Sequence, residues 1–521
     1  MVFKPPSREA FDNDKPVSED IVQSALGSVA KGGALILVGI LCFKLFNFIR
    51  QFAIIRILSP AEYGLFSLGM TVITIYMIFG NLGLHSGSQR YIAFFQARDE
   101  EPRTRGIILS ALRIVFFTAT AITVVSLFLA SPLADLFNKP GEEQVLLWFT
   151  ALIPLSVGIQ LMSSFFLGFK KPSFTVFVEN IGLSLVSLIA VVLFLLVRES
   201  LTSVLVAQVI AHTIVFLAGL LYAVRHFPIP MRGRERVMMG KELLLFSIPL
   251  FASTALSYLM VQTDTLMLGY YTASDQLGFY NAAYLLASVL PVFLMAASNM
   301  FLPVASGLVA REHHRELRNI YRSTTKWLFI FTLPLFLTFF LFPSQTMSIA
   351  FGGGYPTAAQ ALQLLCLGDF VHTLLGPNGM TLVAYGHSRI LLLSTAVATV
   401  TNVILNAILI PRHGITGAAT ASFIALILVN VLISGYLLLR YRIHPFGASY
   451  AKPVVILIVV AGVLYYPLLA LLDVSRWFLL AYYPLFLFIA LGITYASRSL
   501  ETTDRLLISA ARRRFFARKG S

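Results

Sequence analysis

Four polar side chains interrupt the first long apolar segment of the chain at helical spacing. Lys44, Asn47, Arg50 and Gln51 stand at i, i+3, i+6 and i+7, which places them on one face of an α-helix. A charge inside a membrane is costly and normally faces a bundle interior or a watery cavity. Two cations on such a face could hold the phosphate groups of an anionic ligand. Alternatively, Lys44 extends to the membrane surface and Arg50 forms a structural ion pair.

The second half of the chain supplies an acid for comparison. Asp264 is flanked by Gln262 and Thr263 in another apolar segment. It is a cation or proton site, a partner of Arg50, or a gate residue, and the sequence leaves these three interpretations open. The predicted set of cavity residues that bind substrate comprises Lys44, Asn47, Arg50, Arg113 and Asp264.

Five more polar residues inside or at the ends of apolar segments form a second tier of candidates: Arg90, Glu179, Asn180, Asp369 and His372. The i, i+3 spacing of Asp369 and His372 could produce one polar spot. Arg90, together with His85, either meets lipid headgroups or only fixes the topology of the chain. A single His212 in an apolar segment is expected to be a packing residue with a satisfied hydrogen bond.

No motif for catalysis or metal binding stands out. The chain has no His–Glu zinc motif, no Walker loop and no Gly-x-Ser-x-Gly turn. The run 352–354 of three glycines is not followed by Lys-Ser/Thr, so it predicts a turn. Cys42 and Cys366 both lie in apolar segments, which does not indicate a disulfide framework or a thiolate metal site. We expect no catalytic residue, no bound metal and no cofactor.

The composition belongs to a membrane protein that crosses the bilayer many times. Of 521 residues, 57% are hydrophobic and 12% are charged, and the mean hydropathy is +0.81. A soluble chain carries about a quarter charged residues. The net charge of +15 could suggest nucleic acid, but the basic residues occupy short loops between apolar spans. Cytoplasmic loops have this pattern, so we expect no nucleic-acid partner.

A membrane-spanning helix needs about 20 mostly apolar residues, and fourteen segments qualify. Several prolines, among them Pro249, Pro291 and Pro334, fall inside these spans and predict kinks. The predicted spans are 32–55, 64–90, 107–130, 144–168, 173–197, 202–224, 243–270, 278–308, 325–350, 358–384, 388–411, 415–439, 452–472 and 477–497.

The charges test this arrangement. With the N-terminus inside, 31 of the 39 Lys and Arg residues fall on the inner side of the membrane. Five fall outside, namely Arg56, Lys139, Arg198, Arg412 and Arg476. Such a bias predicts a cytoplasmic-membrane protein with both termini inside. A basic amphipathic tail follows the last span, and it either lies on the anionic inner leaflet or is solvated.

A weak internal repeat divides the chain. The stretch 50–66 (RQFAIIRILSPAEYGLF) returns 214 positions later at 264–280 (DTLMLGYYTASDQLGFY), which aligns Gly64 with Gly278 and Arg50 with Asp264. The repeat predicts two similar membrane lobes. The predicted divisions are a cytoplasmic arm 1–31, a six-helix lobe 32–225, a basic linker 226–242, a second six-helix lobe 243–440, helices 13 and 14 over 452–497, and a basic tail 498–521.

Three stretches carry a resemblance to a known family. They are residues 56–64 (RILSPAEYG), the set Asp264, Leu268-Gly269 and 278–281 (GFYN), and the set Asn402, Asn406, 409–411 (LIP), 414–415 (GI) and 417–419 (GAA). Together they resemble the oligosaccharide flippases, or polysaccharide transporters, of the multidrug/oligosaccharidyl-lipid/polysaccharide exporter superfamily. The resemblance implies an all-α membrane protein with two six-helix bundles in a V around a central cavity and two extra C-terminal helices.

The resemblance also implies a function. We expect a transporter rather than an enzyme, which moves a polyprenyl-(pyro)phosphate-linked oligosaccharide across the membrane by alternating access for polysaccharide or surface-glycan synthesis. Its expected partners are the polyprenyl-linked glycan, the anionic lipids of the inner leaflet and glycan-assembly proteins, and the expected transport unit is a monomer.

Two rival functions stay open at this stage. A cation-coupled multidrug exporter of the same superfamily would favour an acidic cavity, whereas Lys44, Arg50 and Arg113 against Glu179 make the first lobe basic. A membrane polysaccharide polymerase or ligase would need a large external catalytic loop. The longest predicted external loop has roughly a dozen residues, well below the ~50 of a folded domain.

Overall fold

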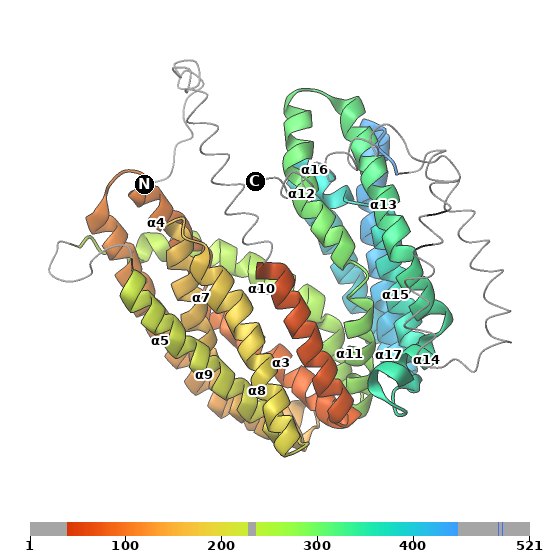
Figure 1. Ribbon diagram of the computed structural model, residues 1–521, viewed down its shortest axis with the longest axis horizontal. Coiled ribbons are helices and arrows are strands. Elements are labelled where there is room, and N and C mark those ends of the chain that lie inside the picture. Colours follow the sequence, from red (N-terminus) through yellow and green to blue (C-terminus); the bar gives the residue numbers. More distant parts are fainter. Residues whose placement is uncertain (1–38, 228–235, 446–487, 489–491, 493–521) are drawn as a thin grey trace, which may run out of the picture. The chain divides into compact units, whose positions relative to one another are not determined.

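The computed structural model describes residues 39–227 and 236–445 and the single residues 488 and 492 (Figure 1). All regular structure in this part of the chain is helical. The first described helix covers residues 39–57. The elements that follow are α3 (Pro60–Asn81), α4 (Leu84–Gln96), α5 (Glu101–Leu136), α6 (Pro140–Thr150), α7 (Leu152–Gly168), the π-helix η1 (Thr175–Gly182), α8 (Leu183–Val197), α9 (Leu201–His226), α10 (Gly240–Tyr271), α11 (Ser274–Ala287), α12 (Val292–Ala310), α13 (His314–Leu341), α14 (Pro343–Phe351), the 3₁₀ turn η2 (Pro356–Ala358), α15 (Ala359–Leu374), α16 (Asn378–Ala384) and α17 (Ser388–Tyr441).

The helices have the length and composition of membrane spans. Within the described residues, nine helical stretches are long and apolar enough to cross a bilayer, and a tenth arises if the bent pair α11 and α12 forms one span. The bend of 48° lies beside Pro291, where a kink was predicted. The prediction of an all-α, multi-pass membrane protein is confirmed for this part of the chain.

The longest helix contains a break that separates two spans. α17 has 54 residues, which would extend about 80 Å at 1.5 Å per residue, far more than a hydrocarbon core of about 30 Å. At Gly414 the backbone leaves the helical region, with φ 54° and ψ −131°. Only glycine adopts such an angle at low cost. The predicted spans 388–411 and 415–439 meet at this break.

Each of the first twelve predicted spans therefore overlaps one or more helices in the described part of the chain. Spans thirteen and fourteen, at 452–472 and 477–497, lie outside the described residues apart from single positions. The predicted arm 1–31, residues 228–235 of the basic linker 226–242 and the tail 498–521 also lie outside them, so the total of fourteen spans and the position of the termini stay predictions.

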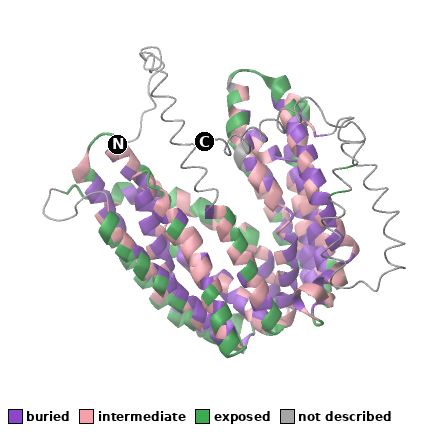
Figure 2. Ribbon diagram, viewed as in Figure 1, coloured by how far each residue is buried: buried purple, intermediate pink, exposed green. Residues whose placement is uncertain are grey.

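The outer faces of several helices carry large apolar side chains that the protein does not cover. Phe116 and Phe117 on α5 are 67% and 69% exposed, and Leu196 and Val197 on α8 are 78% and 87% exposed. Figure 2 shows exposed residues running along α5, α8 and α9. A soluble protein rarely leaves so many rings and branched chains in water, and lipid tails are their natural surroundings.

The helices group into two compact units. Unit 1 comprises the described residues up to Arg50 together with Ile73–Phe128 and Leu147–Leu256. Unit 2 comprises Gln51–Val72, Leu129–Leu146 and the described residues from Ser257 on. The predicted lobes follow chain order, whereas the units follow packing, because the segments 51–72 and 129–146 of the first half of the chain pack with the second half.

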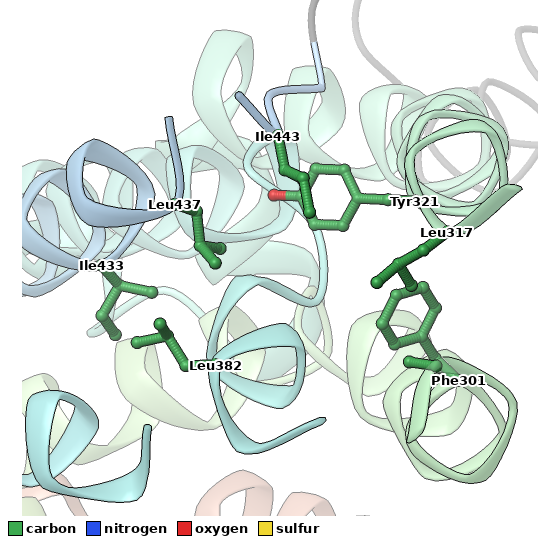
Figure 3. Close-up of a cluster of buried hydrophobic side chains, with 8 residues drawn as sticks. Phe301, Leu317, Tyr321, Leu382, Ile433, Leu437 and Ile443 are labelled. Carbon is green, nitrogen blue, oxygen red and sulfur yellow. The ribbon is translucent and has the colours of Figure 1, made fainter. Parts of the chain in front are cut away.

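Each unit has a core of its own. In unit 2, Phe301 of α12 packs on Leu317 and Tyr321 of α13, and the same cluster continues through Leu382 of α16 to Leu437 of α17 (Figure 3). The Tyr321 hydroxyl lies in this cluster and donates a hydrogen bond to the Leu375 carbonyl, so its polar end is satisfied. A buried hydroxyl without such a partner would cost free energy.

Aromatic rings dominate one core cluster of unit 1. Phe166 of α7 and Phe174 stack with ring centroids 5.0 Å apart and an interplanar angle of 4°. Met162 and Tyr222 complete the contact between α7 and α9. Offset-stacked rings of this kind add to the free energy gained from area burial.

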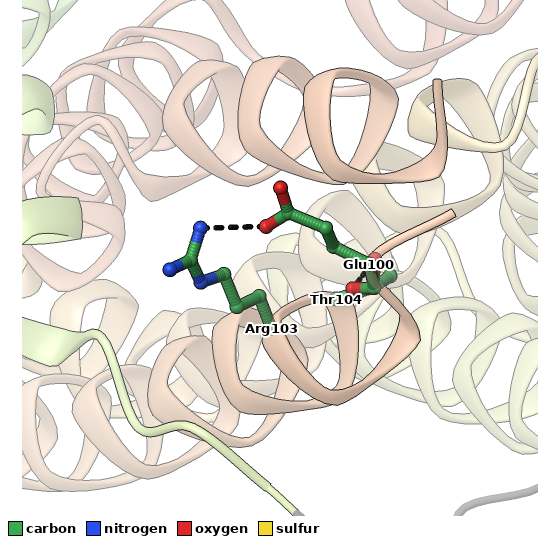
Figure 4. A network of polar contacts seen from close by, with 3 residues as sticks. All are labelled: Glu100, Arg103 and Thr104. Atoms are coloured by element: carbon green, nitrogen blue, oxygen red, sulfur yellow. Dashed lines mark hydrogen bonds and ion pairs between the residues drawn. The ribbon is translucent and has the colours of Figure 1, made fainter. Parts of the chain in front are cut away.

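The start of α5 is fixed by a local polar network. Arg103 Nη1 lies 2.6 Å from Glu100 Oε2, and Thr104 Oγ1 donates to the Glu100 carbonyl at 3.2 Å (Figure 4). An acid at a helix N-terminus also complements the helix dipole. Arg103 and Arg105, two of the basic residues predicted on the inner side, thus pair with acids one turn away, so we exclude them from the candidate site.

The predicted repeat has a direct structural counterpart in unit 2, because equivalent residues meet there. A Cβ atom on Gly64 would lie 1.8 Å from the Ser274 carbonyl oxygen, and one on Gly278 would lie 1.8 Å from the Pro60 carbonyl oxygen. Pro60 and Ser274 are themselves 214 positions apart. Two reciprocal contacts of this kind define a local two-fold axis between the first turns of α3 and α11. Asn281 Nδ2 also donates to the Oγ atom of its repeat equivalent, Ser67, at 3.0 Å.

Candidate functional site

The polar face of the first helix is anchored at Arg50 in unit 1. The Arg50 side chain is 9% exposed, and its Nη2 donates to Asn47 Oδ1 at 2.7 Å. Its Nη1 donates to Gln208 Oε1 of α9 at 3.2 Å. The helical spacing placed Asn47 and Arg50 on one face, and in the structure the two side chains are in contact. The two amide oxygens orient the planar guanidinium, the group whose geometry matches a phosphate.

The two other cations predicted in unit 1 are exposed. Lys44 lies on the helix 39–57, and Arg113 lies on α5 beside the exposed Leu112. A cation within a membrane span that the protein does not cover must reach the membrane surface or a water-filled space. Their exposure is compatible with a basic cavity wall, and a shared role of Lys44, Arg50 and Arg113 stays a prediction.

Glu179 lies on the π-helix η1, which the sequence did not predict. A π-helix often occurs at functional sites because it shifts the register of side chains. Glu179 hydrogen-bonds the hydroxyl of Ser163, which also contacts Thr175 Oγ1 at 2.6 Å. Asn180 contributes its backbone carbonyl to Ser184 at 2.6 Å. Glu179 therefore faces α7, whereas the side-chain nitrogen of Asn180 lies near Gly39 of the first helix.

Three further residues of unit 1 make local contacts. The Arg90 guanidinium is exposed and stands over the Phe246 ring, 4.1 Å from its centroid, which is a cation–π geometry. His85 Nδ1 lies 2.9 Å from the Gln160 carbonyl. His212 is buried, and its Nδ1 donates to the Gln208 carbonyl at 2.7 Å, as expected of a packing residue.

Asp264 of α10 is the centre of a polar site in unit 2. Its Oδ2 accepts a hydrogen bond from Tyr280 Oη at 2.5 Å and another from Ser422 Oγ. Its Oδ1 accepts from Asn406 Nδ2 at 2.6 Å and from Asn402 Nδ2 at 3.3 Å. All four contacts come from neutral donors, and an ionised carboxylate, which can only accept, suits such a shell.

The local fold explains how these donors meet. α10 ends at Tyr271 and α11 begins at Ser274, so the chain reverses and brings Tyr280 back beside Asp264. Asn402 and Asn406 are one turn apart on α17, and the amides face the same side of the helix. The break at Gly414 then returns the chain so that Ser422 reaches the same carboxyl group.

A cavity of about 290 Å³ opens beside Asp264 within unit 2. Asp369 of α15 lines the same cavity, as do Tyr284 and the small side chains of Thr395 and Ala398. The structure therefore brings together two predicted candidates, Asp264 and Asp369, that are 105 positions apart in the chain. A small space with two carboxyl groups and several hydroxyls fits a small cation or a proton better than a sugar phosphate.

Asp369 and His372, predicted as one polar spot, make separate contacts in the described part of the chain. Asp369 faces the cavity, whereas His372 Nδ1 lies 2.9 Å from Asn430 Oδ1. Asn378 Nδ2 donates to the same oxygen at 2.9 Å. Among the described residues, no group of three or more His, Cys, Asp or Glu side chains comes together.

Arg50 and Asp264, which the repeat aligns, belong to different units. Asp264 has the four neutral donors described above, and Arg50 contacts Asn47 and Gln208. A pair between them stays a prediction. The sequence reasoning missed Gln208, Tyr280 and Ser422 as contributors. The sequence does mark all three in the same way, because each is a polar residue inside an apolar span. An unsatisfied polar group is costly there, so each of them needs a partner.

Comparison with known proteins supplies the family. A model of the family described as "Polysaccharide biosynthesis protein" matches residues 29–309, and a MatE model matches residues 249–408. The succinoglycan biosynthesis transport protein ExoT of Rhizobium meliloti (strain 1021) is 26% identical over 324 residues, which are 61% of this chain and 61% of that protein. The probable low-salt glycan biosynthesis flippase Agl15 of Haloferax volcanii is 24% identical over 174 residues, 33% of this chain and 37% of that protein.

The fold has solved counterparts as well. The inward closed conformation of the lipid II flippase MurJ superposes with a TM-score of 0.69, covering 89% of this chain and 99% of that one at 16% identity. An identity this low shows a shared fold only. The first family model covers more than half of the sequence, including Lys44, Arg50, Arg113 and Asp264. The chain therefore belongs to the polysaccharide biosynthesis protein family.

Proposed function

We propose that the protein is a flippase that moves a polyprenyl-(pyro)phosphate-linked oligosaccharide across the cytoplasmic membrane. Family membership supports a role in polysaccharide synthesis, and two relatives are named for transporting or flipping glycans. The observation that carries the proposal is the polar face of the first helix, where Arg50 is oriented by Asn47 and Gln208 inside a membrane span. A preoriented guanidinium is a suitable group for binding phosphate.

In this proposal the cargo crosses by alternating access. The phosphate groups contact Arg50, with Lys44 and Arg113 as further cations, and the polyprenyl tail stays in the bilayer. The acidic cavity of unit 2 has a separate task. At about 290 Å³ it is smaller than most pockets for drug-sized ligands, which span roughly 300–1,000 Å³. A cation or proton that exchanges there could couple transport to an ion gradient.

The test uses a strain from which the gene has been deleted. We expect the glycan to be lost from the cell surface and its lipid-linked precursor to accumulate on the inner leaflet, with both effects reversed by the intact gene. Normal export of the glycan without accumulation, in a strain shown to have no second flippase, would rule the proposal out.

One observation favours a second candidate. The carboxyl groups of Asp264 and Asp369 share a cavity, and both residues fall within the MatE match. A cation-coupled multidrug exporter would use such acids. Deletion would then raise sensitivity to cationic dyes and leave the surface glycan intact, which is the reverse of the result expected for a flippase.

The finer topology is part of the same proposal. We place fourteen spans in the cytoplasmic membrane with both termini inside, the basic tail on anionic lipid and a monomer as the transport unit. Glycan-assembly proteins are the proposed protein partners. A polymerase or ligase is not supported, because the relatives are named for transport and the predicted external loops are short.

A further inference from the structure

A buried lysine joins the two halves of the chain within unit 2. Lys139 stands between α5 and α6 and is 4% exposed. Its Nζ donates to the Gly269 carbonyl at 2.8 Å and to the Thr272 carbonyl at 2.6 Å. Both carbonyls lie at the C-terminal end of α10, where backbone acceptors lack helical partners and the helix dipole is negative. The ammonium group therefore caps α10 with charge-assisted hydrogen bonds.

Lys139 stabilises this contact, whereas a buried acid next to it is destabilising. Glu142, in the first turn of α6, is fully buried, and its backbone N–H donates to the Lys139 carbonyl at 2.9 Å. Within the described residues, neither carboxyl oxygen of Glu142 has a hydrogen-bond partner. A buried carboxyl group without donors is destabilising unless water reaches it.

Burial and neighbouring acids act in opposite directions on the charge of Lys139. Burial lowers the pKa of the Lys139 ammonium, while the nearby acids Glu142 and Asp275 counteract this shift. A cavity of about 540 Å³ adjoins the contact and is lined by Lys139, Tyr270 and Ser274, among others. Water therefore has room beside Lys139.

The same region contains the reciprocal glycine contacts. Ser274, which lines the cavity, is the residue whose carbonyl oxygen abuts Gly64. Lys139 and Gly64 come from the first half of the chain, and the carbonyls that they meet come from the second half. All of these residues belong to unit 2, on the side of the membrane predicted to be external.

We propose that Lys139 and Glu142 set the conformational equilibrium of an external gate, in which Lys139 favours the closed state and Glu142 favours the open state. This inference rests on the alternating access of the proposed function. Opening separates Lys139 from the carbonyls of α10 and hydrates both side chains. The hydrogen bonds of Lys139 are then lost. The carboxylate of Glu142 gains water as a donor, and this gain outweighs the attraction to Lys139 that it gives up, because neither of its oxygens has a hydrogen-bond partner in the closed state. The two groups therefore contribute with opposite sign.

The experiment measures hydrogen–deuterium exchange of the full-length protein in detergent micelles without cargo. Two backbone stretches report on the gate, namely 264–280, which carries the capped end of α10, and 58–66, which carries Gly64. We expect Lys139→Met to speed exchange in both stretches by about tenfold, and Glu142→Gln to slow exchange in both. Lys170→Met and Glu143→Gln are the matched controls, since both parent residues are exposed, and we expect no change from either.

The sign for Glu142→Gln decides between a gate and a structural role. If Glu142 merely complements the N-terminus of α6, its neutralisation in Glu142→Gln destabilises the protein and speeds exchange. Faster exchange in this variant would therefore overturn the proposal. Faster exchange confined to 264–280 in Lys139→Met would also overturn it, because simple fraying of α10 leaves 58–66 unchanged. If Lys139→Met fails to fold, Glu142→Gln alone decides. The exchange experiment contains no cargo, so its result does not depend on flipping. If exchange changes as expected but the protein does not flip the lipid-linked glycan, the proposed function is refuted and the proposed gate is not.

Discussion

Arg50 and Lys44 lie on the same helical face, but the structure gives them different surroundings. Arg50 is buried and oriented by two amide oxygens, whereas Lys44 is exposed. A preoriented, forked guanidinium can hold a phosphate through two parallel hydrogen bonds, and an exposed ammonium acts as a mobile point charge. Arg50 is therefore the stronger candidate for the contact that discriminates phosphate from other anions.

A graded series tests Arg50. Arg50→Lys should keep part of the flipping rate, because the charge remains, and Arg50→Ala should lower the rate by about tenfold or more while the protein still inserts and folds. Flipping in reconstituted vesicles is the measurement, and Arg198→Ala, at an exposed cation in a predicted external loop, is the control.

A purely structural role for Arg50 gives another pattern. If Arg50 only pairs with Asp264, Arg50→Ala destabilises the protein by leaving a buried carboxylate unpaired. Adding Asp264→Asn should then restore both folding and transport. Such a rescue would refute phosphate binding by Arg50 and make Lys44 the better candidate.

The donor shell of Asp264 predicts a specific stability change. In Asp264→Asn, an N–H₂ group replaces one carboxyl oxygen and meets donors on Tyr280, Ser422 or the two asparagines, so unfolding should become easier by about 1–3 kcal/mol. Adding Asn406→Asp returns an acceptor to the cluster and should recover part of the loss. Thermal unfolding in detergent measures both, and an unchanged or higher Tm for Asp264→Asn would contradict the proposed shell.

The sequence could reveal part of this site. Charges inside apolar spans identify Arg50, Asp264 and Asp369 without a structure, because intramembrane charge is rare. Their neutral partners are harder to recognise, because Gln208 and Ser422 lie 158 positions from the groups they contact. Only the three-dimensional path of the chain shows which of the many polar residues in the spans share a site.

At the level of helices, glycine positions explain the close approach of α3 and α11. Backbone atoms of the partner helix occupy the space where a side chain would begin at Gly64 and at Gly278. The alignment of these two glycines in the repeat is visible in the sequence. Their mutual contact is not visible there, because a repeat shows equivalence and says nothing about packing.

Alanine substitutions test this packing. Gly64→Ala and Gly278→Ala each place a Cβ atom 1.8 Å from a carbonyl oxygen, so both should lower the thermal unfolding temperature by similar amounts. Gly307→Ala on α12 is the matched control, since no atom lies within 4 Å of the added Cβ. This control should be neutral or stabilising by up to about 1 kcal/mol, the helix propensity gained over glycine. Equal effects at all three sites would contradict the proposed contact.

Helix boundaries were predictable to different degrees. Hydropathy located the spans that the structure describes, and Pro291 marked the bend. The gap between the predicted spans 388–411 and 415–439 contains the break at Gly414. The π-helix η1 left no trace in the sequence, because the change from i+4 to i+5 hydrogen bonding needs no special residue type. The register of Glu179 therefore could not be predicted from helical periodicity.

For the whole molecule, charge distribution is the basis of the topology. Cysteines introduced at the exposed positions Asn138 and Ala273 should react in intact cells with a thiol reagent that cannot cross membranes. Cysteines at the exposed positions Ala97 and Ser388 should react only after the membrane is opened. Cys42 and Cys366 are replaced by Ala in all variants. Labelling of Ala97→Cys in intact cells would refute the proposed orientation.

The flippase proposal depends most directly on transport by the protein alone. The measurement uses vesicles that contain the purified chain and a fluorescent polyprenyl-pyrophosphate oligosaccharide, with a quencher that stays outside. We predict that the quenched fraction rises from the outer leaflet's share toward the whole pool, and that it rises far more slowly with Arg50→Ala. The contradicting result is a quenched fraction that stays at the outer-leaflet share, as in vesicles without protein, while the same vesicles transport a cationic dye. Transport of the dye would show that the reconstituted protein is active.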